Sequence, residues 1–188
     1  MDVPENELDK RPADDIAYAI IHHSVTPNNV DIANIAAMEK KSFGFVTVGY
    51  HALIRKQGAD WIIQEGRSLD DVPAAALGLN EASYDICIEG NYEVDAIDPR
   101  ALDVLLARIE AVKKKCPNLR YLIGHRDVAG IKQKQDLISA GEASSRYGTA
   151  CPGKNLYAVL PDVRKKSGLG LPPELPADKA PNNEKAPA

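Results

Sequence analysis

The stretch IAYAIIHHSVTP, residues 16–27, places an apolar, partly β-branched run directly before two histidines and a loop. Residues 16–22 are typical of a buried strand, because short apolar runs rich in isoleucine favour the interior of a sheet. The chain has only four histidines, and two of them, His22 and His23, end this run. Neighbouring residues of a strand point to opposite faces, so we expect only one of the pair to face a site.

Four further short segments have the composition of strands and are bounded by turn-forming residues. They are residues 50–55, 60–64, 84–89 and 120–124. The letters QGA separate the first two, which favours a hairpin. In the third, alternation puts Cys87 and Glu89 on one face.

Two longer segments carry helix signals. Residues 31–42 begin with Asp31, a good N-cap, and residues 98–115 begin with Asp98 and Pro99, which suit the cap and the first helical position. The second segment also has one apolar stripe, which favours packing against a sheet. Strands interleaved with helices predict an α/β fold, with a central mixed sheet flanked by helices.

The ends of the chain differ in composition from its middle. Residues 1–15 are polar and are expected to form a flexible N-terminal segment. Residues 16–166 form the predicted single domain, whose last helix is short and broken at Pro161. Residues 167–188 are rich in Pro, Ala, Asn and charge, so we expect a disordered or loosely docked tail.

The composition excludes several classes of protein. The chain has 188 residues, 44% of them hydrophobic, and a net charge of −4, which does not predict a nucleic-acid-binding protein. No apolar run approaches the roughly 18 residues of a membrane span. The start, MDVPENELDKRP, lacks the apolar region of a secretory signal, and the compartment in which the protein acts is left open.

Histidine and cysteine supply the candidate metal ligands. They are His22, His23, His51, His125 and Cys151. Zinc accepts imidazole and thiolate, and two histidines with one cysteine fit a catalytic site that keeps a fourth position open. The structural alternatives are a surface histidine pair, a hydrogen-bonded histidine at a strand end and a buried, inert cysteine.

Five segments, in order, carry a resemblance to a known family. They are IIHHS (20–24), VGYHALIRKQGADWIIQEGR (48–67), the run ending in GLNEASYDICIEG (72–90), LIGHRDVA (122–129) and TACPG (149–153). They resemble the zinc amidase family that includes N-acetylmuramoyl-L-alanine amidases, phage lysozyme-amidases and animal peptidoglycan recognition proteins. The resemblance spans roughly residues 16–160 and implies the same fold.

The resemblance implies a zinc ion held by His22, His125 and Cys151, because these residues match the three ligand positions of the family. The position after the first ligand varies in the family, so His23 is expected to be a bystander. If Cys151 were not the third ligand, Asp127 or Asp136 would be its substitute.

The resemblance also implies roles for side chains around the metal. Tyr50 and Thr149 would stabilise the oxyanion or orient the nucleophile, and His51, Arg67 and Asn80 are expected to bind substrate.

This chain departs from the family in three respects. The histidine that usually follows the GR segment is missing, since VPAAALG has alanine there. Some members carry a catalytic Glu where this chain has Cys87, so Glu89, on the same face, is the fallback acid–base candidate. The gap between the second and third ligands is also unusually long, and residues 131–148 are expected to cover or extend the substrate groove.

The implied activity is peptidoglycan hydrolysis at the amide between the lactyl group of N-acetylmuramic acid and L-alanine, performed by zinc-activated water. The substrate would be peptidoglycan or a muropeptide. The alternatives are a non-catalytic peptidoglycan-binding module, an antibacterial effector with an immunity partner, and a protein partner bound through the C-terminal tail.

Overall fold

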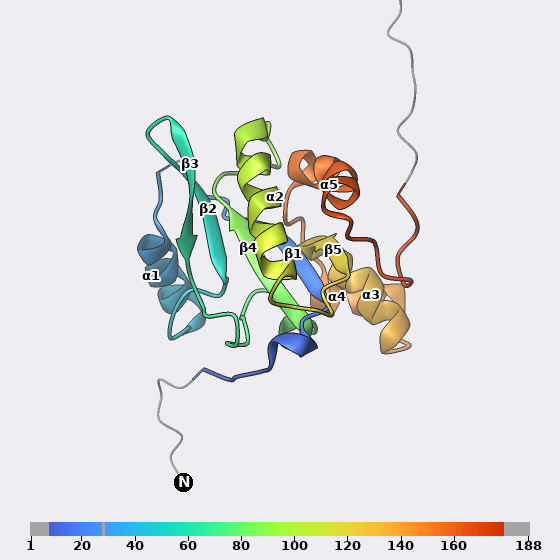
Figure 1. The fold of residues 1–188 in the computed structure, drawn as a ribbon. Coiled ribbons are helices and arrows are strands. Elements are labelled where there is room, and N and C mark those ends of the chain that lie inside the picture. The colour runs from blue at the N-terminus through green and yellow to red at the C-terminus, as the bar shows by residue number, and fades with distance from the viewer. Residues whose placement is uncertain (1–7, 28, 179–188) are drawn as a thin grey trace, which may run out of the picture.

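Five strands form one mixed sheet in the computed structural model, which describes residues 8–27 and 29–178 (Figure 1). The strands are β1 (Tyr18–His23), β2 (Ala52–Gln57), β3 (Asp60–Glu65), β4 (Ser83–Ile88) and β5 (Tyr121–Gly124). Their order is β3-β2-β4-β1-β5, and all neighbours are parallel except the β2–β3 hairpin. The predicted fold class, an α/β domain with a mixed sheet, is confirmed.

In the described part of the chain, five α-helices and three short 3₁₀-helices surround the sheet. They are α1 (Ile32–Phe43), α2 (Pro99–Lys113), α3 (Val128–Gln135), α4 (Ala140–Tyr147), α5 (Lys154–Ser167), η1 (Ala13–Asp15), η2 (Asn80–Ala82) and η3 (His125–Asp127). The predicted caps are present, because Asp31 accepts from the Asn34 N–H and Asp98 accepts from the Arg100 N–H.

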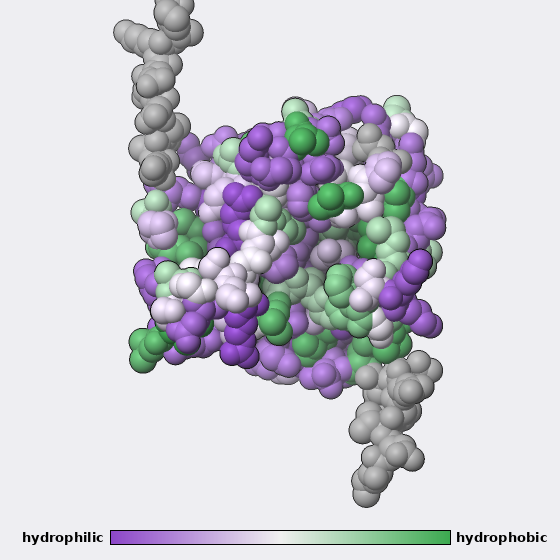
Figure 2. Space-filling model, turned by 180° about the vertical axis from the view of Figure 1, so that it is seen from behind, coloured by the Kyte–Doolittle hydropathy of each residue, from purple (hydrophilic) through white to green (hydrophobic). Residues whose placement is uncertain are grey.

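Strand β1 is buried along its whole length and divides the core into two layers. Ala19 and Ile21 pack in the layer under α2 and α5, whereas Ile20 packs with α3 on the opposite face. Alternation therefore puts His22 on the face of Ile20, beside Cys87, its register partner on β4. Figure 2 views the molecule from this side, where hydrophobic residues lie over the middle of a largely hydrophilic outline.

The predicted break at Pro161 is wrong, since α5 continues through this residue to Ser167. A proline inside a helix removes one backbone hydrogen bond, which normally favours a helix end. Here Leu156, Leu160 and Val163 are almost fully buried in the core on both sides of the proline. This tertiary packing holds the helix together across the lost bond.

The described part of the N-terminal segment is fixed to the domain, in contrast to the expected flexibility of residues 1–15. The Arg11 N–H donates to Asp70 O at 2.8 Å, and the Val72 N–H donates to Asp9 O at 2.8 Å. The Arg11 side chain is only 6% exposed. Residues 1–7 lie outside the described part of the chain.

The described part of the C-terminal tail is docked as well. Gly170 extends the sheet edge, where its N–H donates to Arg120 O at 2.9 Å and its carbonyl accepts from the Leu122 N–H at 3.0 Å. Leu169 is buried, and Arg164 forms an ion pair with Asp178. The tail up to residue 178 thus packs on its own domain, and residues 179–188 lie outside the described part. Among the described helices, none is long and apolar enough to cross a bilayer.

Candidate metal centre

The structure brings His22, His125 and Cys151 together, although they come from separate segments. One potential ligand atom from each lies within 4.8 Å of the others. Ile21 of β1 pairs with Gly124 of β5, so His22 and His125 follow at the same edge of two neighbouring parallel strands. Their ring centroids are 4.7 Å apart, and His22 Nδ1 lies 3.7 Å from Cys151 Sγ.

Backbone contacts bring the cysteine loop to the two histidines. The Arg126 N–H donates to Cys151 O at 2.8 Å, which joins the second and third ligand segments. Thr149 is exposed, and its Oγ1 accepts from the Cys151 N–H at 3.1 Å. Gly153 has φ +85°, and a Cβ there would lie 2.4 Å from the carbonyl carbon of Tyr92. Only glycine lets the loop approach this closely.

The donor set fits zinc. Two imidazoles and one thiolate are the ligands that zinc prefers, and a set of three keeps one coordination position open. His22 is buried, whereas His125 and Cys151 are partly exposed, so the set is reached from the solvent side.

Burial tunes the two histidines differently. Burial lowers the pKa of His125 to about 3, so this ring is neutral at neutral pH and offers a lone pair. Burial would also lower the pKa of His22, but hydrogen bonds with Asp85 and Cys151 raise it to about 9. Binding a metal here must therefore release the proton that His22 shares with these partners.

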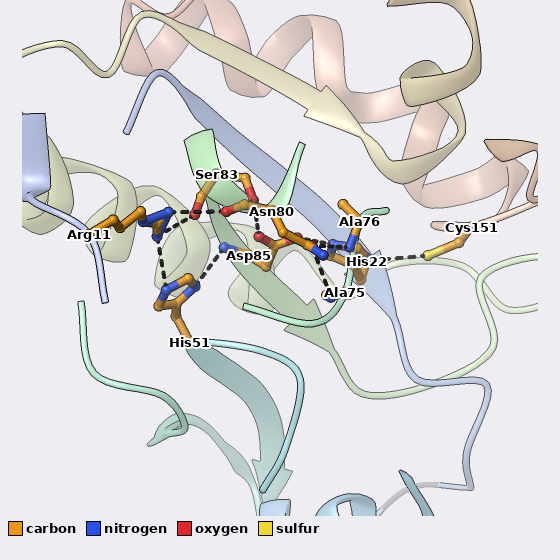
Figure 3. A network of polar contacts seen from close by, with 9 residues as sticks. All are labelled: Arg11, His22, His51, Ala75, Ala76, Asn80, Ser83, Asp85 and Cys151. Carbon is orange, nitrogen blue, oxygen red and sulfur yellow. Dashed lines mark hydrogen bonds and ion pairs between the residues drawn. The ribbon is translucent and has the colours of Figure 1, made fainter. Parts of the chain in front are cut away.

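The sequence analysis missed Asp85, which contacts a predicted ligand directly. Its Oδ1 lies 2.7 Å from His22 Nε2, and its side chain is fully buried on β4 (Figure 3). Burial would raise the pKa of Asp85, but the hydrogen bond with His22 holds it below the usual range. An acidic residue inside the buried strand YDICIE was a visible signal, since an unpaired charge is rarely buried.

His51 does not lie on the surface, so the prediction that it contacts substrate is wrong. The residue is fully buried, and its Nδ1 accepts from the Asp85 N–H at 3.0 Å. Burial lowers the pKa of His51 to about 4, which keeps the ring neutral. Its role in this structure is to hold β4, and with it Asp85, in place.

Tyr50 lies next to His22, and its catalytic role stays a prediction. Its ring centroid is 5.1 Å from that of His22, and the residue is partly exposed. Burial of the phenol raises the pKa of Tyr50 well above its usual value, so the hydroxyl stays a hydrogen donor. Burial likewise raises the pKa of the neighbouring Cys87 thiol, which is therefore a poor base at neutral pH.

Glu89 cannot be the acid–base group that the sequence suggested. It is fully buried, and its carboxylate accepts from the Val30 N–H at 2.5 Å and the Lys56 N–H at 2.9 Å. These bonds tie the loop before α1 to β2. A carboxylate with no exposed surface cannot reach a substrate.

The two other predicted substrate residues are partly exposed but make structural hydrogen bonds. Arg67 donates to the carbonyls of Val48 and Val72. Asn80 accepts from the backbone N–H groups of Ala75 and Ala76 at 3.2 and 2.8 Å. Both side chains hold the backbone of the loop between β3 and β4, and binding of substrate by them stays a prediction.

His23 points away from the candidate metal ligands, as alternation predicts. Its Nδ1 accepts from the Tyr92 N–H at 3.2 Å, and its ring stacks on that of Tyr92. The proposed substitute ligands are occupied elsewhere as well. Asp127 accepts from the Tyr157 hydroxyl at 2.6 Å, and Asp136 pairs with Lys132 at 2.8 Å.

Glu39 is a second acidic residue that the sequence analysis missed. Its carboxylate, on α1, accepts from the Gly49 N–H at 2.7 Å and so lies next to the segment of Tyr50. Burial raises the pKa of Glu39 above its usual value. The surrounding letters, MEKKSF, read as an ordinary helix surface, so the sequence carried no signal for this placement.

The long segment between the second and third ligands folds into α3 and α4. Ile131 and Tyr147 bury against Ile20 of the sheet, and Ser139 caps α4 in a capping box with Glu142. The segment therefore covers the sheet beside the ligands. That this segment covers or extends a substrate groove stays a prediction.

The chain is similar to known proteins both in sequence and in fold. The family model described as N-acetylmuramoyl-L-alanine amidase matches residues 12–153. Peptidoglycan-recognition protein SC1a/b of Drosophila simulans is 26% identical over 151 residues, which cover 76% of this chain and 70% of that protein. An endolysin of Enterobacteria phage K11 is 27% identical over 116 residues, covering 58% of this chain and 74% of the endolysin.

Several solved structures share the fold, and two of them illustrate the likeness. The N-acetylmuramoyl-L-alanine amidase LysCS from Clostridium intestinale superposes with a TM-score of 0.64 at 23% identity, over 87% of this chain and 91% of that one. Bumblebee PGRP-SA gives a TM-score of 0.65 at 25% identity, over 86% and 89% of the two chains.

Proposed function

Because the chain belongs to the N-acetylmuramoyl-L-alanine amidase family, we propose that it is a zinc-dependent peptidoglycan hydrolase. The bond cleaved is the amide between the lactyl group of N-acetylmuramic acid and L-alanine of the stem peptide. The observation that carries the proposal is the approach of His22, His125 and Cys151 to within 4.8 Å, with the Tyr50 phenol beside them.

Each side chain of the site has a part in this reaction. A zinc ion held by the three ligands would supply Lewis-acid chemistry, lowering the pKa of a water molecule to about 7 and polarising the amide carbonyl. Tyr50 keeps its hydroxyl hydrogen because of its raised pKa. The hydroxyl donates a hydrogen bond to the oxygen on which negative charge develops. Thr149 keeps Cys151 in place through the backbone.

The test combines metal analysis with identification of the products. We expect about one zinc per chain, and we expect purified cell wall to release stem peptides that begin with a free L-alanine amine. A chelator should abolish the release and added zinc should restore it. Products with new reducing sugar ends, or new amines within the stem peptide, would assign a different bond and contradict the proposal.

Peptidoglycan binding without cleavage is the second candidate function. The observation that favours it is Cys87, a buried thiol at the position where some members of the family carry a catalytic Glu. Sedimentation with insoluble cell wall, combined with no release of peptides by the zinc-loaded protein, would support this candidate over the hydrolase.

Replacing Tyr50 with phenylalanine should lower kcat about a hundredfold and leave the zinc content unchanged. Loss of one donor to a developing oxyanion typically costs about 2.7–4 kcal/mol. Steady-state kinetics on a soluble muropeptide would measure the effect. Tyr121→Phe is the matched control, because Tyr121 packs on Tyr18 at the start of β5. Equal kcat values for Tyr50→Phe and the control would exclude Tyr50 as the oxyanion donor.

A further inference from the structure

A buried carboxylate binds the inner side of the His22 ring. Asp85 Oδ1 and His22 Nε2 are 2.7 Å apart, and neither side chain is more than 1% exposed. An ionised carboxylate only accepts hydrogen bonds, so Nε2 carries a hydrogen, and Nδ1, on the side of Cys151, is the nitrogen that can lose its proton and bind a metal. We propose that Asp85 is a positioning residue that fixes the tautomer and orientation of His22 for metal binding. The proposal rests on the zinc site of the proposed function.

Asp85 is itself held in one orientation. The Ser83 hydroxyl donates to its Oδ2 at 2.5 Å, so each carboxylate oxygen has its own donor. His51 forms two hydrogen bonds with the backbone of Asp85. The ring Nδ1 of His51 accepts from the Asp85 N–H at 3.0 Å, and the backbone N–H of His51 donates to the Asp85 carbonyl at 3.0 Å. Because Nδ1 accepts, His51 Nε2 carries the hydrogen, which it donates to Asp71 O at 3.1 Å.

Arg11 supplies the opposite charge in the same buried network (Figure 3). Its Nη2 donates to Ser83 O at 2.6 Å, and its Nη1 donates to Asn80 O at 3.1 Å. Nη2 also lies 3.2 Å from His51 Nε2, but both atoms carry hydrogens, so this approach is a contact between two donors rather than a hydrogen bond. A buried charge is costly unless an opposite charge compensates it. Burial lowers the pKa of Arg11, and the negative charge of Asp85 opposes this effect of burial. Arg11 precedes residue 12, where the match to the family begins.

The test measures zinc affinity, which does not depend on turnover. The zinc dissociation constant would be determined by competition with a chromophoric chelator. Asp85→Asn preserves the shape but weakens the acceptor, and loss of such a partner typically lowers metal affinity about 10- to 100-fold. Ser83→Ala should cause a smaller loss in the same direction. Lys10→Ala is the matched control, because the exposed side chain of Lys10 pairs with Asp70 and Asp71, and its zinc affinity should be unchanged.

A double variant separates positioning from charge balance. Asp85→Asn with Arg11→Met removes both buried charges, so its metal-free form should be more stable than Asp85→Asn alone. We expect its zinc affinity to stay about 10- to 100-fold below that of the wild type. Wild-type affinity in this variant would show that Asp85 only balances Arg11, and would overturn the proposal.

The remaining outcomes are also decisive. If neither Asn variant folds, Ser83→Ala decides, because it keeps both charges, and unchanged zinc affinity there contradicts the positioning role. A wild type that binds no zinc would overturn the proposed function together with this inference, whereas a zinc-binding wild type with an unaffected double variant would overturn the inference alone.

Discussion

Cys151→Ala should lose most of its zinc and release no detectable peptide from cell wall. Two imidazoles alone leave an incomplete set for a site in which three protein ligands hold the metal. The loop itself should persist, because the bonds from the Arg126 N–H and to Thr149 Oγ1 use the backbone of residue 151. Zinc content measured by atomic emission, together with product mass spectrometry, would report both losses.

Two companion variants sharpen this expectation. Cys116→Ala removes another buried thiol, which packs in the core with α2, and should keep full zinc. Cys151→Asp replaces the thiolate with a carboxylate, which zinc also accepts, and should recover part of the metal. Full zinc and full turnover in Cys151→Ala would show that this residue is not a ligand.

His22→Ala and His23→Ala should behave very differently although the residues are adjacent. His22→Ala removes a predicted ligand and leaves Asp85 buried without its partner, so both zinc and turnover should be lost and stability should fall. His23→Ala removes only the hydrogen bond from the Tyr92 N–H and the stacking on its ring. It should cost about 1 kcal/mol of stability and leave the zinc content intact.

The comparison needs three measurements on each variant: zinc content, turnover and thermal unfolding of the metal-free form. The last measurement shows how much of the loss in His22→Ala comes from the unpaired Asp85. If His23→Ala lost as much zinc as His22→Ala, our choice between the two histidines would be reversed.

The face of each strand residue could be predicted from the sequence, because alternation has a period of two. His22 and His23 therefore separate as expected, and the helix caps at Asp31 and Asp98 follow from local chemistry. The mixed character of the sheet also follows from the alternation of strands and helices with one hairpin, since parallel neighbours need long crossovers. The order of the strands does not follow, because β4 lies between β2 and β1.

Burial depth and long-range contacts could not be predicted in this way. Glu89 lies on the predicted face, yet the loop before α1 covers it. His51 follows Tyr50, yet Asp85 and Arg11 enclose it from segments 34 and 40 residues away in the chain. The contact of Asp85 with His22 depends on the pairing of β1 with β4. Strand periodicity describes one element at a time, whereas these placements depend on which elements meet.

The bond between the Arg126 N–H and the Cys151 carbonyl closes the segment that carries α3 and α4 at its base. This hydrogen bond encloses the 24 residues from 127 to 150. Closure entropy depends weakly on length, so halving the segment would change it by only about 0.6 kcal/mol. The number of residues between His125 and Cys151 can therefore vary at little cost in closure entropy. Natural variation or engineering can replace the segment that carries α3 and α4 while the geometry at its base is kept.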